Sequence, residues 1–208
     1  MFGGKLFTFK FLPIGILCAL GLLCGGGALC AADVRLAISV PDQRMALVQD
    51  GVEVARYRIS TSRFGLGDQL GSYATPTGLL EVAQKIGDRV QEGTVFKSRR
   101  PTGEVLPPNA PGRDPIVTRI LWLRGLESNN VNSHKRCIYI HGTPEEKFLG
   151  KPVSWGCIRM GSKDVMKVYD AVAVGAKVEI AEKRLKVMVK EYSQSFLLAQ
   201  NRRDANAR

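Results

Sequence analysis

Two reactive side chains stand 16 positions apart in the second half of the chain, each beside a glycine. His141 precedes Gly142, and Cys157 follows Gly156. A free thiol has a pKa of about 8.5 and is mostly protonated at neutral pH, whereas the thiolate is the nucleophile. Because a neutral imidazole can accept the thiol proton, this pair suits nucleophilic catalysis by cysteine.

The two glycines permit close approach of backbone where a side chain would block it. We therefore expect backbone N–H groups around Gly156 and Cys157 to form an oxyanion hole for a tetrahedral intermediate. A backbone turn between His141-Gly142 and Gly156-Cys157 would bring the two reactive side chains together. Gly142 and Gly156 are accordingly predicted to belong to the substrate-binding site.

Three further side chains of the segment SWGCIRM are predicted to contact substrate. Arg159 follows Cys157 by two residues, so in an extended segment both side chains point the same way. Arg159 then either binds a substrate carboxylate through a bidentate contact or forms a structural ion pair. Ser154 either binds substrate or shapes the turn, and Trp155 is either a stacking platform or a lid over the thiol.

Non-catalytic interpretations exist for the same residues. Cys137 and Cys157 are the only cysteines beyond the N-terminal segment, and in an oxidising compartment they can pair as a disulfide. His134 and His141 could complete a zinc site with them, but the four residues lack a tight metal-ligand spacing. The sequence therefore predicts no metal and no other cofactor, with Cys137 a buried thiol and His134 solvated.

The hydrophobic pattern predicts a mainly β fold, a sandwich or barrel-like domain with one or more short helices. Alternation of apolar and polar residues indicates strands at 34–40, 44–49, 52–60, 79–85, 116–123, 137–140 and 176–181. A change of phase between Val54 and Ala55 indicates a bulge. A meander of antiparallel strands is the simplest account. A helix is expected at 162–174, capped by Ser162 and ended by Gly175.

Three polar connections interrupt these elements. Residues 61–78 are rich in Gly and Ser and resemble an ordinary surface loop. Residues 87–114 are too long for a plain hairpin, and we expect them to form a mobile flap. Residues 124–136 form a further polar loop.

The chain has 208 residues and a formal net charge of +11, which suits one domain with appendages in anionic surroundings. No aromatic and basic module for reading nucleic acid is evident. Residues 1–32 carry Lys5 and Lys10 before an apolar run that ends in small residues. They are predicted to be a secretory signal peptide or an N-terminal membrane anchor, the only membrane contact. We therefore expect an exported protein of the periplasm or cell envelope.

The segment from His141 to Met160, with its HG and SWGCIRM motifs, resembles the L,D-transpeptidase catalytic domain, also called the YkuD family. The resemblance extends upstream to PDQRMALVQDG, RISTSRFG and SYATPTG and covers roughly residues 34–181. One position departs from it, because the family usually has His or Arg where this chain has Trp155. The chain is thus divided into residues 1–32, a catalytic domain at 33–181, and a basic C-terminal extension at 182–208 that we expect to be partly disordered.

The resemblance implies a cysteine acyltransferase that acts on the stem peptides of peptidoglycan. Cys157 would form a thioester with the donor peptide, and His141, oriented by a backbone carbonyl, would transfer the protons. The acceptor amine would come from a second stem peptide or from a lipoprotein lysine. Ser72 and residues 75–78 would then line the site.

Three other functions remain open on the sequence. With water as acceptor the same site is a carboxypeptidase or endopeptidase. A protein without catalytic activity could instead bind the cell wall. A redox or metal role for Cys137 and Cys157 is the third.

Overall fold

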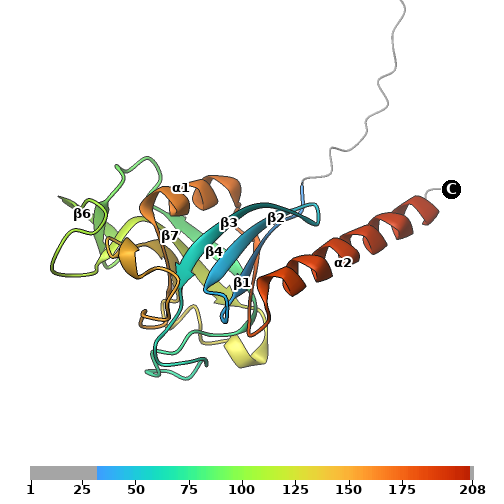
Figure 1. Cartoon of the computed structure of the whole chain (residues 1–208), viewed down its shortest axis with the longest axis horizontal. Coiled ribbons are helices and arrows are strands. Elements are labelled where there is room, and N and C mark those ends of the chain that lie inside the picture. Colours follow the sequence, from blue (N-terminus) through green and yellow to red (C-terminus); the bar gives the residue numbers. More distant parts are fainter. Residues whose placement is uncertain (1–31, 207–208) are drawn as a thin grey trace, which may run out of the picture. The chain divides into compact units, whose positions relative to one another are not determined.

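The fold was determined as a computed structural model, which describes residues 32–206. The predicted export segment, apart from Ala32, lies outside the described residues. Among those residues, no helix is both long enough and apolar enough to cross a membrane. Figure 1 shows strands gathered into one curved body, with a short helix against it and a long C-terminal helix that starts beside the strands and projects away from them.

Ten strands and two α-helices make up the described chain, with two short 3₁₀ turns. In chain order they are β1 (Val34–Ser39), β2 (Arg44–Gln49), β3 (Val52–Ser60), β4 (Gly78–Ile86), β5 (Thr94–Lys97), β6 (Arg100–Val105), β7 (Ile116–Gly125), η1 (Ser128–Asn130), β8 (Tyr139–Gly142), η2 (Glu146–Phe148), β9 (Ile158–Met160), α1 (Ser162–Ala171), β10 (Lys177–Ala181) and α2 (Leu185–Asn206). The predicted mainly β fold is confirmed.

The first three strands form the predicted antiparallel meander. In the register of β2 and β3, Leu47 lies opposite Ala55 and Val48 lies opposite Glu53, so Val54 is the extra residue. The bulge predicted from the change of apolar phase is therefore confirmed. Its origin is physical, because an inserted residue moves the following side chains to the other face of the strand.

The remaining strands close the sheet into a barrel with mixed strand directions. The order is β4-β10-β1-β2-β3-β9-β8-β7-β5-β6, and a further pairing of β4 with β7 joins the two sides. A simple antiparallel meander is wrong for this part, because β1 pairs with β10 and β8 pairs with β9 in parallel. Parallel neighbours need long crossover connections, and short-range alternation in the sequence does not reveal them.

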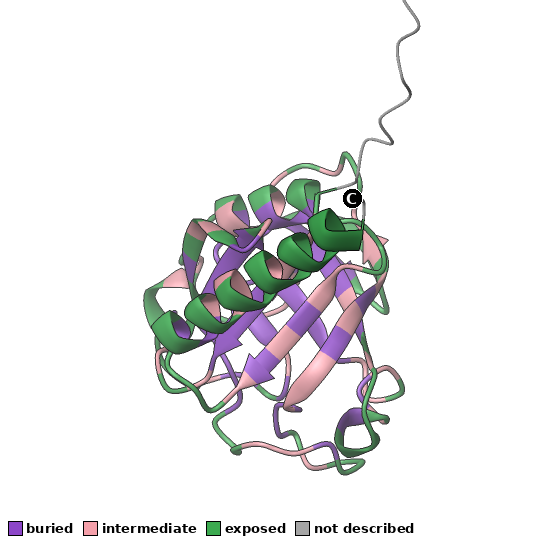
Figure 2. Cartoon of the chain, turned by 90° about the vertical axis from the view of Figure 1, so that its right-hand side faces the viewer, coloured by how far each residue is buried: buried purple, intermediate pink, exposed green. Residues whose placement is uncertain are grey.

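The barrel interior is the main hydrophobic core. It is filled by fully buried aliphatic side chains from the barrel strands, among them Leu36, Ile59, Leu80, Ile140 and Ile158. Helix α1 adds Val165, Val168 and Tyr169 to the same cluster, as the helical spacing predicted. The pattern of alternately buried and half-buried residues along the strands is visible in Figure 2.

Helix α1 begins at Ser162 as predicted, but its cap and its C-terminal end differ from the prediction. Gly161, with no side chain to bond, occupies the N-cap position, and Ser162 is the first helical residue. The N–H of Ser162 instead donates to Glu146 Oε1 at 2.8 Å, so a distant carboxylate caps the helix. The helix ends at Ala171, before Gly175, because the backbone of Val172 is already extended.

The basic extension at 182–208, expected to be partly disordered, contains helix α2. Leu185 and Met188 are its buried residues and pack on Ala37, Ala46 and Val48 of β1 and β2. Most of its outer surface is exposed (Figure 2). Leu185, Met188, Tyr192 and Phe196 recur at helical spacing. The helix was missed because charged residues and exposed apolar residues off that face obscure the pattern.

Residues 87–114, predicted to form a mobile flap, contain a hairpin of β5 and β6. The two turn residues, Ser98 and Arg99, have φ angles of 50° and 65°. Positive φ at both central residues is the requirement of a type I′ hairpin turn, which usually selects Asn or Gly. Ser-Arg is a poor signal for such a turn, and the hairpin could not be recognised from the sequence.

Candidate active site

The two predicted catalytic residues lie on adjacent parallel strands. His141 of β8 is the register partner of Arg159 of β9, and Cys157 immediately precedes β9. Ile140 and Ile158 point into the main core, whereas Tyr139 and Cys157 belong to a cluster on the other face. Since side chains alternate along a strand, Tyr139, His141, Cys157 and Arg159 share that second face.

This register makes His141 a diagonal neighbour of Cys157. Their Cα atoms are separated by two residues along the strand, at ~3.3 Å per residue, and by one strand spacing of ~4.8 Å. The diagonal distance between the two Cα atoms is therefore about 8 Å. That distance is within the combined reach of an imidazole and a thiol. The structure therefore places the predicted pair side by side, on one face of the sheet.

The imidazole of His141 is held by the backbone. Its Nδ1 lies 2.8 Å from the carbonyl oxygen of Gly142. A carbonyl can only accept, so Nδ1 carries the proton and Nε2 of the neutral ring presents a lone pair. The backbone carbonyl that the family resemblance implied as the orienting group is thus the carbonyl of Gly142.

Burial keeps His141 neutral. The residue is 5% exposed, and removal from water lowers the pKa of His141 from its ordinary 6.5 to about 4. The hydrogen bond to Gly142 and the charge of Asp114 act in the opposite direction, and Arg159 adds to the lowering. At neutral pH the ring is therefore an unprotonated base.

The sulfur of Cys157 has two backbone partners. The thiol donates to the carbonyl of Cys137 at 3.3 Å, and the N–H of Tyr139 donates to the sulfur at 3.4 Å. Among the described residues, a direct hydrogen bond between Cys157 and His141 is not formed. The resting thiol proton is thus held by a carbonyl, while the Tyr139 N–H is placed to stabilise a thiolate.

The resting thiol is protonated. Burial raises the pKa of Cys157 to about 11, while the hydrogen bond from Tyr139 and the charges of Arg159 and Arg136 favour the thiolate. With His141 also neutral, the resting pair is thiol and imidazole, not thiolate and imidazolium. Such a pair needs general-base removal of the thiol proton during attack.

The turn before Cys157 is organised by Ser154 and Thr75. Ser154 Oγ donates to the carbonyl of Cys157 at 2.6 Å and accepts from the N–H of Gly156 at 3.2 Å. Thr75 Oγ1 donates to the carbonyl of Gly156 at 3.0 Å. Of the two possibilities for Ser154, the structure shows the shaping of the turn. The N–H of Gly156 is thus occupied, whereas the N–H of Cys157 has no hydrogen-bond partner within the described part of the chain.

Both glycines are required by geometry. Gly156 has a φ of 117°, and a Cβ there would lie 3.3 Å from the carbonyl oxygen of Ala74. A Cβ on Gly142 would lie 2.6 Å from the carbonyl oxygen of Val117 on β7. Gly142 thus lets β7 approach closely behind His141, and its direct contribution to the site is the carbonyl that orients the imidazole.

Arg159 forms the ion pair that the sequence analysis left open. Its guanidinium lies 2.6 Å from Asp114 Oδ2 and 3.7 Å from Glu145 Oε2. Asp114 also accepts a hydrogen bond from Thr143 Oγ1. Arg159 is mostly buried, so in this structure its charge is matched by carboxylates of the chain itself.

Trp155 belongs to an exposed aromatic cluster beside the nucleophile. Phe64, Tyr73 and Trp155 are 47%, 55% and 52% exposed, and their ring centroids lie 5.0–5.9 Å apart. The Arg63 guanidinium lies 4.4 Å from the centroid of Trp155. Trp155 is thus directed to the surface with two partner rings, as a platform requires. We call these four residues the aromatic surface.

Cys137 and His134 do not form the alternative sites. Cys137 and Cys157 are both free thiols. Among the described residues, no group of three or more His, Cys, Asp and Glu side chains is arranged to hold a metal ion. The ring of His134 stacks on Trp122 at 4.1 Å, away from catalysis.

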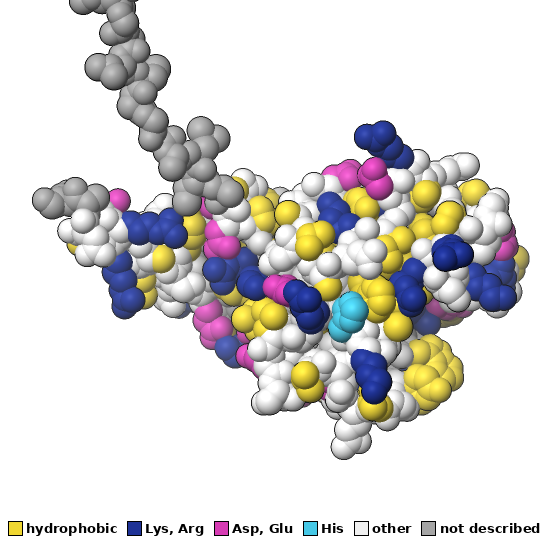
Figure 3. Space-filling view, turned by 180° about the vertical axis from the view of Figure 1, so that it is seen from behind, with side chains coloured by type: hydrophobic (Ala, Val, Ile, Leu, Met, Phe, Trp, Pro, Cys, Tyr) yellow, Lys and Arg dark blue, Asp and Glu magenta, His cyan; other side chains and the backbone are white. Residues whose placement is uncertain are grey.

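A cavity of about 520 Å³ lies elsewhere on the domain, at the start of α2. Its lining is basic, but Asp42 and Glu53 pair with two of the arginines. It is lined by Asp42, Arg44, Arg56, Arg184, Leu185, Lys186 and Val187. None of these is a predicted site residue. Lys and Arg side chains are also scattered over the face shown in Figure 3 and form no single stripe there.

Comparison with known proteins identifies this arrangement. The model of the YkuD family, the L,D-transpeptidase catalytic domain, matches residues 33–180. The chain belongs to the YkuD family. Family membership confirms the resemblance carried by the HG and SWGCIRM motifs.

Individual relatives are similar to this YkuD-family chain over only part of their own length. YqjB of Bacillus subtilis (strain 168), named as a candidate L,D-transpeptidase, is 44% identical over 43 residues, which are 21% of this chain and 24% of YqjB. An L,D-transpeptidase structure from Mycobacterium tuberculosis H37Rv is 23% identical with a TM-score of 0.47, covering 73% of this chain and 58% of that one. L,D-transpeptidase 3 of M. tuberculosis, with a faropenem-derived adduct, is 23% identical with a TM-score of 0.48, covering 73% and 61%. The chain thus spans less than two thirds of the length of each.

Sequence reasoning missed several residues of this YkuD-family site. Tyr139 and Cys137 contact the sulfur through backbone atoms, which carry no residue-type signal. Asp114 lies in the supposed flap and Arg136 ends a loop interpreted as polar and solvated. A buried, paired charge in a polar segment looks the same in sequence as an exposed one.

Proposed function

We propose that this domain is an L,D-transpeptidase that acts on peptidoglycan stem peptides through a thioester on Cys157. The observation that carries the proposal is the placement of Cys157 and His141 on one face of neighbouring strands, with Nδ1 of His141 bound to Gly142. Family membership supports the same chemistry. No cofactor is needed for it.

The first half-reaction begins from a neutral thiol and a neutral imidazole. When the donor peptide is bound, the thiol exchanges the carbonyl of Cys137 for Nε2 of His141, which takes its proton. The sulfur then attacks the carbonyl carbon of the diamino acid, in its peptide bond to the terminal D-amino acid of the stem tetrapeptide. The N–H of Cys157 stabilises the oxyanion, and the N–H of Tyr139 stabilises the sulfur as its charge develops.

Collapse of the tetrahedral intermediate forms the thioester. The C–N bond breaks, the terminal D-amino acid leaves, and His141 returns the proton to its amine. In the second half-reaction an acceptor amine, from another stem peptide or a lipoprotein lysine, attacks the thioester, and His141 accepts its proton. The amide forms, and the thiol of Cys157 is restored.

The aromatic surface is the second part of the proposal. Exposed aromatic rings next to a nucleophile supply contact area at a low cost in side-chain entropy. Among the described residues, Arg63 has no carboxylate partner, so its charge is available for an anionic group of the peptide. We assign Trp155 and Arg63 to binding of the peptide substrate.

Export is proposed on the sequence alone. Lys5 and Lys10 before an apolar run support a secretory signal or anchor, and the proposed substrate lies outside the cytoplasmic membrane. The domain is accordingly assigned to the periplasm or cell envelope.

Acylation by a carbapenem followed by mass spectrometry tests the nucleophile. One solved relative carries a faropenem-derived adduct, which makes a β-lactam a suitable probe. We expect an adduct on the peptide containing Cys157, none in Cys157→Ala, and an unchanged adduct in Cys137→Ala. An adduct on Cys137 would contradict the assignment.

Incubation with tetrapeptide muropeptides then separates transfer from hydrolysis. Cross-linked dimers are the expected product. Trimmed monomers alone would identify a carboxypeptidase, and wall binding that is retained without any product would identify a binding protein.

A further inference from the structure

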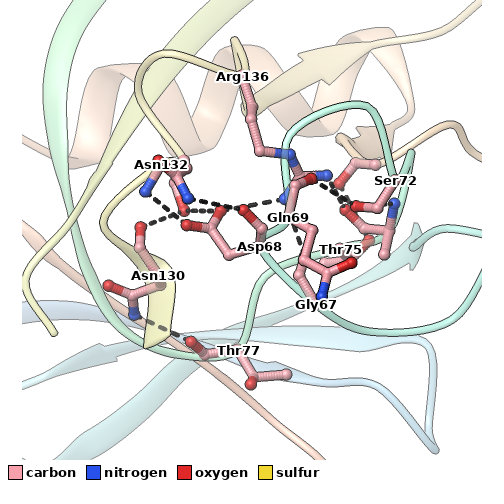
Figure 4. A network of polar contacts seen from close by, with 12 residues as sticks. Gly67, Asp68, Gln69, Ser72, Thr75, Thr77, Asn130, Asn132 and Arg136 are labelled. Atoms are coloured by element: carbon pink, nitrogen blue, oxygen red, sulfur yellow. Dashed lines mark hydrogen bonds and ion pairs between the residues drawn. The ribbon is translucent and has the colours of Figure 1, made fainter. Parts of the chain in front are cut away.

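Behind the nucleophile lies a buried ion pair that the proposed chemistry does not use. The side chains of Arg136 and Asp68 are each 6% exposed, and Arg136 Nη1 lies 3.0 Å from Asp68 Oδ1. Ser133 Oγ also donates to Asp68, at 3.0 Å. Figure 4 shows Asp68 between Asn132 and Arg136, where the loop before β8 meets the loop at 61–78.

The guanidinium of Arg136 ties these two loops together. Its Nη1 donates to the carbonyl of Gly67 at 2.8 Å, and its Nη2 donates to the carbonyl of Ala74 at 2.6 Å. A planar guanidinium with several donors can hold two backbone segments and a carboxylate at once, whereas a lysine ammonium cannot reproduce that geometry.

Each tied segment has a direct contact with the turn that carries Cys157. Cys137 follows Arg136 in sequence, and its carbonyl accepts the hydrogen bond of the Cys157 thiol. Ala74 precedes Thr75, whose hydroxyl donates to the carbonyl of Gly156. Arg136 therefore fixes both sides of the nucleophile turn through their neighbours in the chain.

A purely stabilising role explains the pair poorly. Burying two charges costs about as much desolvation energy as their attraction returns, so a buried ion pair contributes little net stability compared with apolar residues. Its position next to both supports of Cys157 gives a different reason for its presence.

We propose that Arg136 is a positioning residue for the nucleophile, which ties the two loops that flank Cys157 and places one positive charge beside the sulfur, with Asp68 balancing that charge. The role in catalysis rests on the proposed function, whereas the effect on the thiol does not. The charge of Arg136 is among the influences that favour the thiolate of Cys157.

The test measures alkylation of Cys157 by iodoacetamide against pH in the full chain. Peptide mass spectrometry distinguishes Cys157 from Cys137. Three variants are compared with the wild type. Arg136→Met removes the cation, Asp68→Asn removes the balancing anion, and Arg136→Lys keeps the charge but not the planar contacts.

Opposite shifts are the expected result. Arg136→Met raises the apparent pKa of the Cys157 thiol and slows its alkylation at fixed pH, whereas Asp68→Asn lowers that pKa and accelerates the reaction. A shift of one pKa unit changes the rate about threefold, once the weaker nucleophilicity of the more acidic thiolate is counted. Arg136→Lys keeps the apparent pKa near the wild-type value but slows carbapenem acylation.

Variants of a second, more exposed ion pair provide the control. Arg124 and Glu81 join β7 to β4 away from the thiol. Arg124→Met and Glu81→Gln should leave the alkylation profile unchanged. If a single variant fails to fold, the double variant Asp68→Asn/Arg136→Met leaves no buried charge unpaired, and its thiol pKa should lie between those of wild type and Arg136→Met.

Shifts in the same direction for Arg136→Met and Asp68→Asn, or no shift in either, would overturn the proposal. Alkylation needs no peptide substrate, so the result does not depend on transpeptidase activity. Opposite shifts in a protein that forms no muropeptide product would retain the positioning role and reject the proposed function. Product formation without these shifts would retain the proposed function and reject the positioning role.

Discussion

The hydroxyl of Thr75 donates a 3.0 Å hydrogen bond to the carbonyl of Gly156, 81 residues later in the chain. The same Oγ1 accepts from the N–H of Ser62 at 2.9 Å. One buried hydroxyl therefore satisfies two backbone groups and fixes the turn that carries Cys157.

Thr75→Val removes this hydroxyl with little change in shape. We expect the free energy of unfolding to fall by about 2–6 kcal/mol, because two buried backbone groups lose their partner at about 1–3 kcal/mol each. The rate of carbapenem acylation should fall as well. Urea unfolding and acylation kinetics measure the two effects. Thr94→Val, which removes a buried hydroxyl bound to the carbonyl of Gln91, should lower stability without slowing acylation.

His141 makes stability depend on pH. Its folded pKa is about 4 against an ordinary 6.5, so between these values the unfolded chain binds a proton that the folded chain does not. The contribution of His141 to the free energy of unfolding is fully present above pH 6.5. It decreases by about 3 kcal/mol as the pH falls to 4. When stability is measured by urea unfolding from pH 7 to pH 4, the His141→Gln variant should lack this part of the pH dependence. An identical slope in both proteins would refute the neutral, buried imidazole.

Trp155→Ala should weaken substrate binding more than it slows the chemical step. An aromatic contact contributes about 0.5–1.5 kcal/mol beyond its buried area, so KM for a muropeptide should rise up to about tenfold. Steady-state kinetics separate KM from kcat. Phe148 is a suitable control, because it is also exposed and also lies near a cation, Lys147 at 5.1 Å, outside the aromatic surface. A fall in kcat alone would indicate that Trp155 shapes the thiol turn instead.

Cys137 should be replaceable, because it contacts the nucleophile through its carbonyl. We expect Cys137→Ala to retain acylation within a few-fold of wild type, and Cys157→Ala to lose it completely. Thiol titration of denatured wild-type protein, with and without reductant, should give the same count for these two positions. A bond between them would appear as a count that rises on reduction.

The sequence predicted the parts of this protein that depend on local pattern. Strand alternation located most of the barrel, and the change of phase at Val54 located its bulge. The paired motifs, together with their resemblance to the YkuD family, predicted Cys157 and His141 as the catalytic pair. Parallel pairing, barrel closure and the β5–β6 hairpin depend on contacts between distant residues, which local pattern does not contain.

The supporting residues of the site were hidden for a related reason. Asp114, Arg136 and the carbonyls of Cys137 and Gly142 act through burial and backbone direction. A charged residue in a polar loop is usually solvated, and only the folded chain shows that Arg136 is enclosed. Helix α2 is docked by the buried Leu185 and Met188 and by the hydrogen bond from Tyr192 to Glu179, contacts that only the folded chain shows.

Because β4 pairs with β7, β6 is the strand with an unpaired edge among the described strands. All six residues of β6 are exposed. Such an unpaired edge can pair with strands of other molecules and start aggregation. Pro101 lacks an amide hydrogen, Gly103 disfavours extended pairing, and Arg100 and Glu104 add charge. The edge of β6 is therefore protected against pairing with the strands of other molecules.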